Sequence, residues 1–421
     1  MDKNGEDVII VGGGIGGLTL ALALHKAGIK CRVFEAVPQL KPLGVGLNLL
    51  PHAMRELDSL GLKETLCDKG IVTREYSFYT NHGQLVDHEP RGQFAGLDWP
   101  QVSIHRGDLH LALYDAVCER LGAESVVLGQ RCVGFDQDAD GVSVHLEESS
   151  SGRRLPNVRG KVLIACDGVH SIARKLFHPR EASPRYQGST QWRGVTRWKP
   201  FQSGASMCYI GTFRTGKLIT YPIRNNIDEE GNQLINWVIE FARPEEQQRD
   251  WNREGKLEDF VHLFDACNFD WLDVPAMLRA ADAVYEYPMV DQDPLSFWTN
   301  GRVTLLGDAA HPMMPRGSNG AAQAIIDATT LARLLAECSD WQVALKEYEA
   351  RRLKATADVV LANREIAPDA ILLVVDERTG GRPFDNIDDV ISRDERKQWQ
   401  LRYKQVAGFS ADALKASPGL A

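Results

Sequence analysis

Three glycines near the amino terminus constrain the fold of this chain more than any other feature. Gly12, Gly14 and Gly17 form a G-x-G-x-x-G pattern directly after a short apolar segment, residues 7–11. The first glycine permits a tight turn, the second admits a phosphate close to the backbone, and the third lets a helix pack closely on the strand. We therefore predict a strand, a turn and a helix whose amino-terminal end faces an anionic group.

The residues after these glycines favour a nucleotide site over a plain glycine-rich turn. A helix is expected over 18–27, and a second strand over 31–34 ends at Glu35. An acid at this distance from the glycines accepts hydrogen bonds from a ribose in dinucleotide-binding βαβ units. The predicted contacts in this unit are Gly12, Gly14, Ile15, Gly16, Gly17 and Glu35.

A second segment in the middle of the chain also places an acid and a glycine after an apolar strand. The strand over 162–165 is followed by Asp167-Gly168, by Ser171 and by a helix. On its own this pattern also fits an ordinary turn in which Asp167 or Ser171 caps the helix.

A third segment repeats the arrangement late in the chain. An apolar strand over 303–306 ends at Gly307-Asp308, and a loop rich in proline and glycine leads into a helix of small residues near Gly320. Such a loop can turn several backbone N–H groups toward one electron-rich ligand. A Gly-Asp pair alone is common in turns, so its weight comes from the two earlier segments.

The three motifs in this order resemble those of the class A flavoprotein aromatic hydroxylases, the single-component FAD monooxygenases. The resemblance covers residues 7–365, and segments such as SIHRGDLH, QWRGVT and RGSNGAAQAIIDA are similar to phenazine-modifying members of that family. It implies an α/β, Rossmann-like FAD-binding fold that is interrupted by an antiparallel-sheet substrate domain and followed by a C-terminal helical segment. The expected boundaries are 1–72, 101–185 and 290–365 for the FAD-binding domain, 73–100 and 186–289 for the substrate domain, and 366–421 for the helical tail.

The resemblance implies an FAD-dependent monooxygenase that uses NAD(P)H and O2. It would hydroxylate, with or without decarboxylation, an aromatic acid or an N-heteroaromatic compound such as a phenazine, through a flavin C4a-hydroperoxide. The FAD is expected to be non-covalent, and NADH or NADPH is expected to bind transiently because no second complete G-x-G-x-x-G follows. No catalytic side chain and no metal are predicted, since the cofactor carries this chemistry.

Other functions remain open from the sequence alone. A related FAD oxidoreductase, such as an epoxidase, a reductase or an NAD(P)H oxidase, would share the three motifs. So would a flavin-binding regulator without catalytic activity, which would bind FAD but show no substrate-stimulated oxidation of NAD(P)H.

The resemblance also implies the remaining cofactor contacts. Arg106 matches an arginine near the FAD ribose and pyrophosphate, although a surface salt bridge would also explain it. Asp308 is expected to bond the ribityl chain, and the loop after it the pyrimidine edge of the flavin, supported by Pro315 and Gly317. For His311, a structural role is favoured over that of a general base. The contacts implied are Gly44, Val45, Arg106, Asp167, Asp308, Pro315, Gly317, Ser318, Asn319, Gly320 and Ala321.

The substrate is expected between the flavin and the aromatic-rich strands of residues 186–289. Because side chains alternate along a strand, only part of any candidate set can face a pocket, and the others are core residues. The substrate candidates are Gln191, Trp192, Arg193, Tyr209, Tyr221, Trp237 and Met289.

Charge, apolar runs and cysteine spacing limit the classes of partner and the cellular location that we expect. The formal net charge of −9 argues against nucleic acid as the main partner. The acidic start and the lack of an apolar run of about 20 residues indicate a cytoplasmic protein with no membrane association. We expect a monomer or a homodimer, and the sequence does not distinguish between them. The eight cysteines include no C-x-x-C pair, so we expect free thiols. The segment 211–217 (GTFRTGK) nearly matches a phosphate-binding loop but is followed by a strand-like segment, and we expect a hairpin turn.

Overall fold

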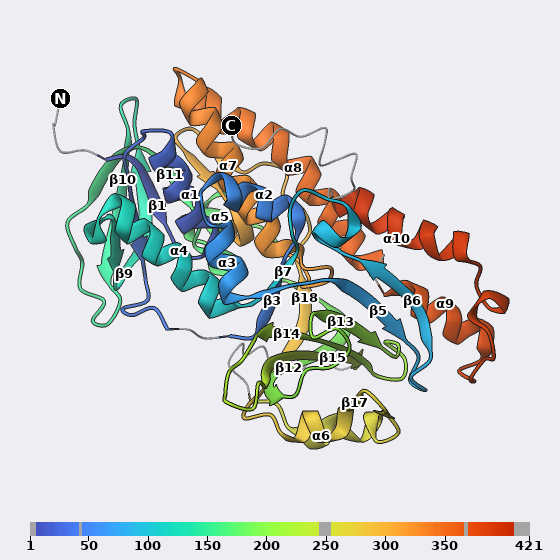
Figure 1. Cartoon of the computed structure of the whole chain (residues 1–421). Helices are drawn as coiled ribbons and strands as arrows, with labels where there is room; N and C mark the ends of the chain where they lie inside the picture. Colours follow the sequence, from blue (N-terminus) through green and yellow to red (C-terminus); the bar gives the residue numbers. More distant parts are fainter. Residues whose placement is uncertain (1–5, 42–43, 244–253, 366–368, 408–421) are drawn as a thin grey trace.

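The computed structural model describes residues 6–41, 44–243, 254–365 and 369–407 of the 421-residue chain. One half of the molecule is built on a mainly parallel sheet, which holds β1, β10 and β11 in Figure 1. Its strands lie side by side in the order β19 (Thr299–Asn300), β20 (Val303–Leu305), β11 (Val158–Ala165), β1 (Glu6–Val11), β2 (Cys31–Glu35) and β8 (Val126–Leu128). The hairpin of β9 (Gln130–Gln137) and β10 (Val142–Glu148) joins this sheet through β11.

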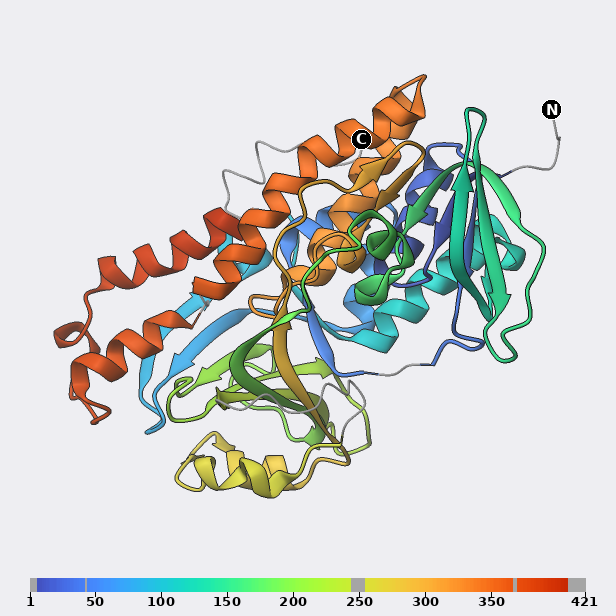
Figure 2. The same ribbon diagram turned by 180° about the vertical axis from the view of Figure 1, so that it is seen from behind.

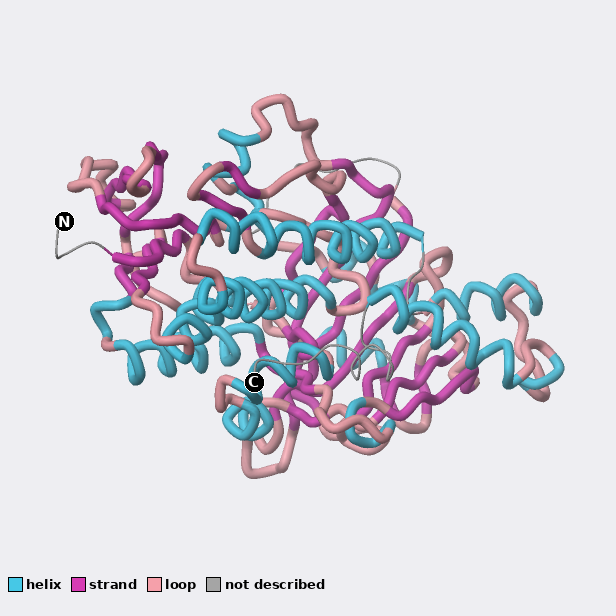
Figure 3. The backbone as a smooth tube through the Cα atoms, turned by 90° about the horizontal axis from the view of Figure 1, so that it is seen from above, coloured by secondary structure: helices cyan, strands magenta, loops and turns pink. Residues whose placement is uncertain are grey.

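Helices cover this sheet, and α1 (Ile15–Lys26) packs against both α4 (Arg106–Leu121) and α7 (Asn319–Glu337). The long helices α7 and α8 lie side by side, as the view from above also shows (Figure 3). The other helices of this half are α2 (Pro51–Ser59), α3 (Lys63–Lys69), α4 (Arg106–Leu121), α5 (Ile172–Phe177), α7 (Asn319–Glu337) and α8 (Trp341–Glu365).

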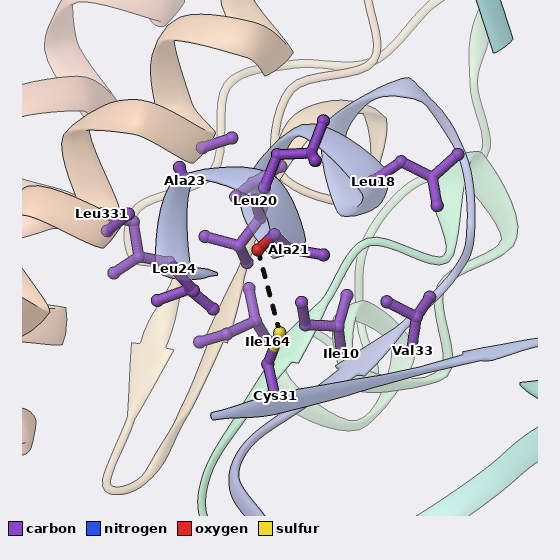
Figure 4. Close-up of a cluster of buried hydrophobic side chains, with 14 of the residues drawn as sticks. Ile10, Leu18, Leu20, Ala21, Ala23, Leu24, Cys31, Val33, Ile164 and Leu331 are labelled. Carbon is purple, nitrogen blue, oxygen red and sulfur yellow. Dashed lines mark hydrogen bonds between the residues drawn. The ribbon is translucent and has the colours of Figure 1, made fainter. Parts of the chain in front are cut away.

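The core of this half forms around α1, which is apolar on every side. Residues 17–24 of this helix are all buried, as expected for a helix that packs between a sheet and other helices. Figure 4 shows Leu20 and Leu24 of α1 among Ile164 of β11 and Leu331 of α7. The thiol of Cys31 contacts the Ala21 carbonyl oxygen at 4.0 Å, which places this cysteine inside the core.

A second sheet forms the other half of the molecule. Its neighbouring strands are antiparallel except for β13 and β5, which are parallel. This pair differs from the antiparallel arrangement that we predicted, and the reason is that β5 comes from a distant part of the chain and no hairpin joins it to β13. The strand order is β18 (Val284–Asp291), β12 (Arg185–Trp198), β15 (Gln233–Ala242), β14 (Lys217–Arg224), β13 (Ser206–Ile210), β5 (Glu75–Tyr79) and β6 (Leu85–Pro90).

The two halves are joined by chain segments that run through both, as Figure 2 shows for β18 and the start of β12. A small sheet of β3 (Gly46–Leu49), β7 (Val102–His105) and β4 (Ile71–Val72) also lies at the junction, where β7 contacts β14. The segment 211–217 connects β13 and β14 as the expected hairpin turn.

The two faces of the second sheet pack against different elements. On the outer face lie α6 (Val274–Arg279) and two 3-10 turns, η4 (Leu257–Asp259) and η5 (Val261–Phe264). The inner face packs at one end against α9 (Ala370–Thr379), while α10 (Arg393–Ala407) contacts α8 and α9. Both α9 and α10 lie within residues 366–421, the segment that we expected to be a helical tail. The remaining short elements are η1 (Gly92–Ala95), η2 (Ala123–Ser125), β16 (Asn268–Phe269), β17 (Leu272–Asp273), η3 (Gly168–His170), η6 (Gly307–Ala309) and η7 (Ile387–Asp389).

We predict that Gly17→Ala destabilises the protein more than Gly28→Ala. A Cβ atom at Gly17 would lie 2.0 Å from the Gly12 carbonyl oxygen, whereas one at Gly28 would meet nothing within 4 Å. Gly28 has a φ of +72°, so its substitution carries backbone strain alone. Overpacking costs about 1–3 kcal/mol, and thermal unfolding of the two variants would measure the difference. Equal melting temperatures would show that α1 can shift away from β1 without cost.

Candidate functional site

The three sequence motifs meet at one edge of the parallel sheet. In that sheet β1 pairs with β11 and β11 pairs with β20, all in parallel. Their carboxyl ends therefore lie together, and these ends are followed by Gly12, by Asp167 and by Asp308 respectively. This is the edge at which open α/β sheets bind ligands.

The glycine turn after β1 is shaped by close backbone contacts. Gly12 has a φ of +103°, and a Cβ atom there would lie 2.2 Å from the Cys166 carbonyl oxygen. By contrast, a Cβ atom at Gly14 would meet nothing within 4 Å. Gly14 is also the N-cap of α1, and because it has no side chain it cannot cap the first N–H groups of the helix. The amino-terminal end of α1 thus faces open space with free N–H groups, which suits a phosphate.

Glu35 lies beside this turn at the end of β2. One carboxylate oxygen accepts a hydrogen bond from the Gly13 backbone N–H at 2.6 Å, and the other accepts from the Val37 N–H at 2.8 Å. The carboxylate therefore orders the turn in addition to lying where a ribose is expected.

The two acids after β11 and β20 have different surroundings. Asp167 accepts a hydrogen bond from the Ile172 N–H at 2.9 Å with one oxygen, while its other oxygen is buried without a partner among the described residues. Burial raises the pKa of Asp167. Asp308 is exposed and forms no hydrogen bond or ion pair with any residue that the structure describes. Both arrangements leave acceptor atoms for a ligand.

The loop before α7 presents a second helix terminus to the same edge. Gly317 and Ser318 have φ angles of +64° and +61°, in the left-handed region. Ser318 is the N-cap of α7 but gives no side-chain hydrogen bond, and a Cβ atom at Gly320 would meet nothing within 4 Å. The amino-terminal end of a 19-residue helix, with its partial positive charge, thus lies next to this open space.

The loop that leads into β3 borders this edge and contacts the second sheet. The Gly44 carbonyl oxygen lies 3.0 Å from His105 Nε2, and the Arg106 N–H donates to the Val45 carbonyl at 3.1 Å. The Gly46 N–H donates to Asn236 Oδ1 of β15 at 2.7 Å. The guanidinium of Arg106 is exposed and forms no salt bridge within the described part of the chain, so a surface salt bridge does not explain this residue.

These features fit a dinucleotide cofactor that carries a flat ring. The α1 terminus and the open side of Gly14 suit the pyrophosphate, and the α7 terminus suits an electron-rich ring edge. Comparison with known protein families identifies the cofactor. Residues 6–363 match the FAD binding domain family. The chain belongs to this family.

Individual relatives agree. The chain is 42% identical over 363 residues to the phenazine 1,6-dicarboxylic acid hydroxylase PhzS of Lysobacter antibioticus, covering 85% of this chain and 89% of the relative. It is 31% identical over 380 residues to the 3-hydroxybenzoate 6-hydroxylase of Polaromonas naphthalenivorans (strain CJ2), covering 87% of this chain and 89% of the relative.

Solved structures show the same fold. Klebsiella pneumoniae HpxO, complexed with FAD and uric acid, matches with a TM-score of 0.75 and 24% identity, over 98% of this chain and 97% of that one. A salicylate hydroxylase substrate complex matches with a TM-score of 0.72 and 23% identity over the full length of both chains. The predicted fold class and the predicted cofactor, FAD, are therefore confirmed.

The alternation along the strands sorts the substrate candidates of this FAD-binding protein into two faces. Gln191, Arg193 and Tyr221 belong to the inner face, toward the FAD-binding half. Tyr209 is also on the inner face, but its ring stacks on Phe78 with 5.0 Å between ring centroids. Met289 is buried on β18, two residues from Tyr287, which pairs with Gln191.

Trp192 and Trp237 do not belong to the site, and these two predictions are corrected. Both are fully buried on the outer face, where each ring packs against Phe260. The Trp237 indole N–H donates to Thr196 Oγ1 at 3.0 Å. Trp192 alternates with Gln191 and Arg193 along β12, and Trp237 follows the inner-face residue Asn236 along β15, so both rings point away from the FAD-binding half.

His311 lies in the core, as favoured from the sequence. Its Nε2 is 2.5 Å from Asp327 Oδ2, and both side chains are buried. Asp327 also accepts hydrogen bonds from the Gly307 N–H and from Arg352 Nε. The histidine thus helps to hold the turn that carries Asp308.

Three residues on the inner face of the second sheet were not predicted. Asn236 bonds the Gly46 N–H, while Glu240 and Lys217 form a buried ion pair on the inner face. A charged residue inside the apolar run of β15 was the signal that could have identified Glu240, because buried acids need partners.

We predict that Asp308→Ala weakens FAD binding about tenfold or more without loss of fold stability. The side chain has no protein partner in the described residues, and a hydrogen bond to a charged acceptor is worth about 1.5–3 kcal/mol. Titration of apoprotein with FAD and thermal melting of the apoprotein would test both parts. Asp115→Ala, which removes an exposed acid from α4, is the matched control. Unchanged FAD affinity would remove Asp308 from the site.

We predict the opposite pattern for Trp237→Phe. The loss of the Thr196 hydrogen bond and of buried volume should reduce the free energy of unfolding by about 1–3 kcal/mol. FAD affinity and the KM for an aromatic substrate should not change. Urea denaturation and steady-state kinetics would measure these quantities, and a raised KM with normal stability would return Trp237 to the site.

Proposed function

We propose that this protein is an FAD-dependent monooxygenase that uses NAD(P)H and O2 to hydroxylate an aromatic acid or an N-heteroaromatic compound such as a phenazine. The surroundings of Arg193 carry the proposal. Its Nε and Nη2 atoms both donate to Gln191 Oε1, at 3.1 and 2.7 Å, and no described carboxylate pairs with it. Other arginines with little exposed side-chain surface do have such a partner, as in the Arg174–Glu181 and Arg352–Asp327 pairs.

The groups around Arg193 suit a planar anion. Its guanidinium lies 5.7 Å from the ring centroid of Tyr287. Burial lowers the pKa of Arg193, and the nearby positive charge of Arg106 lowers it further. Two guanidinium groups without carboxylate partners therefore share one region at the junction of the sheet and the FAD-binding half. A bound aromatic carboxylate would relieve their repulsion.

Tyr221 provides a neutral donor on the same face. Burial raises the pKa of its hydroxyl above the usual value, so the group remains protonated near neutral pH. The side chains of Asn236 and Asn48 lie next to this hydroxyl. A phenol held in this way can donate a hydrogen bond to a substrate oxygen or ring nitrogen.

When bound, FAD supplies the redox chemistry, accepting a hydride from NAD(P)H and activating O2 for transfer of one oxygen atom. The chain's own groups hold and shield the reactants. The α7 terminus, beginning after Ser318, would favour negative charge on the flavin ring. Two surfaces would exclude water from between the flavin ring and the substrate. They are the loop that contains Gly44 and Val45, and the inner face of the second sheet.

The relatives support this assignment, since the names of the two reported above describe hydroxylases of aromatic carboxylates. All eight cysteines are free, which agrees with the reducing cytoplasm as the site of the reaction. Within the described part of the chain, no helix combines the length and the apolar character that a bilayer span requires.

The test is a screen of NAD(P)H oxidation against aromatic acids, phenols and phenazines, with mass analysis of the products and parallel measurement of hydrogen peroxide. We expect at least one aromatic acid to accelerate flavin reduction and to gain one oxygen atom. Oxidation that yields peroxide alone with every compound would indicate an NAD(P)H oxidase. Bound FAD without any stimulated oxidation would indicate a regulator.

We predict that Arg193→Met raises the KM for an acidic substrate about tenfold or more, because a hydrogen bond to a charged group is lost. The KM for the corresponding amide should change far less. Steady-state kinetics with the acid and amide pair would show this difference. An equal rise for both compounds would mean that Arg193 does not recognise the acid.

A further inference from the structure

Glu240 is a fully buried carboxylate that receives hydrogen bonds from three directions. From β12, Ser189 Oγ and Gln191 Nε2 donate to it at 3.0 and 3.2 Å. From β14, Lys217 Nζ lies 3.0 Å from Oε2. From the loop before α7, Arg316 Nη2 donates to Oε1 at 2.7 Å. One side chain of the second sheet is thus bonded to the loop that borders the FAD site.

The strand register explains the contacts within the sheet. Gln191 pairs with Glu240 between β12 and β15, and Glu240 pairs with Lys217 between β15 and β14. The three side chains therefore lie in a row across neighbouring strands, on the face of Arg193. Arg193 donates to Gln191 Oε1 while Gln191 donates to Glu240, so the amide joins the guanidinium to the carboxylate.

Glu240 is held in its charged form by the two bases that contact it. Although burial alone raises the pKa of Glu240, the ammonium of Lys217 and the guanidinium of Arg316 outweigh it and hold that pKa below its usual value. Lys217 Nζ also lies 3.2 Å from Asp369 Oδ2, at the start of α9. Two acids and two bases thus balance in charge, so Glu240 remains an acceptor for Arg316 and Gln191.

Arg316 is placed to control the backbone that follows it. The next two residues, Gly317 and Ser318, are in the left-handed region, and Ser318 is not a glycine. A serine holds this conformation only where its surroundings fix it. Arg316 supplies such fixation through both terminal nitrogens of its guanidinium, because Nη1 donates to the Asn363 carbonyl at 3.3 Å while Nη2 donates to Glu240.

We propose that Arg316 is a positioning residue for the flavin-binding end of α7, and that Glu240 and Gln191 couple it to Arg193. The conformation of the loop and the state of the substrate face are then linked. Linkage works in both directions, so a change at Gln191 alters how well the loop binds FAD. Arg316 need not touch the reacting atoms for this effect.

A double-mutant cycle on FAD affinity tests the coupling. The variants are Arg316→Gln, Gln191→Leu and the double variant, each prepared as apoprotein and titrated with FAD, with binding followed by flavin fluorescence. We expect losses of about tenfold for Arg316→Gln and about threefold for Gln191→Leu. The double variant should lose about tenfold and not about thirtyfold, because Gln191 acts through Arg316.

Two further variants separate positioning from general damage. Arg316→Lys retains the charge facing Glu240 and should restore affinity to within about threefold of the wild type. Arg351→Gln removes an arginine of the exposed Arg351–Glu347 pair on α8 and should leave FAD affinity unchanged. If Arg316→Gln does not fold, the cycle is run with Arg316→Met, which also removes the hydrogen bond to Glu240, and Gln191→Leu, and the same departure from the product of the single losses is expected.

Multiplicative losses in the cycle would overturn the proposal, as would an unchanged FAD affinity in Arg316→Gln. The titration contains no substrate, NAD(P)H or turnover. Its outcome is therefore independent of the proposed hydroxylation, and a protein that fails the substrate screen can still pass or fail this test.

Discussion

The close approach of backbone to backbone at the glycine turn is the constraint on which the rest of the site depends. There is no room for a side chain between Gly12 and the end of β11, or between Gly17 and Gly12. These contacts fix the amino-terminal end of α1 at the edge where β11 and β20 also end. Because all three strands are parallel neighbours, motifs separated by more than 100 residues must meet there. The meeting of the three motifs at the proposed FAD site is therefore a consequence of strand order.

A second constraint, strand register, decides what the sheet presents to that site. Along β12, Gln191 and Arg193 share one face while Trp192 between them faces the other. A slip of one residue would bury the arginine among aromatic rings and place the indole beside the flavin loop. The pairing of β12 with both β15 and β18 prevents such a slip, since it fixes the strand on both sides.

The features that sequence predicted well are those with a local physical cause. The turn at Gly12 and the start of α7 follow from what glycine permits and from a strand that runs into a helix. The failures have non-local causes. Aromatic content marked Trp237 as a candidate, but only register shows which face it occupies. The cluster of Glu240 joins residues distant in sequence, so no short pattern predicts it.

The balance of charges on the inner face of the second sheet relates the fold to the binding of substrate. The negative charges of Glu240 and Asp369 balance the positive charges of Lys217 and Arg316, so this cluster has no net charge. Arg193 is left out of this balance, because its neighbour Gln191 is an amide and cannot neutralise it. A partly buried charge of this kind is costly unless an opposite charge joins it. In the proposed function an aromatic carboxylate supplies that charge by binding to Arg193. Arg193 is linked through Gln191 and Glu240 to Arg316 in the loop before α7, so binding of the substrate would also affect that loop.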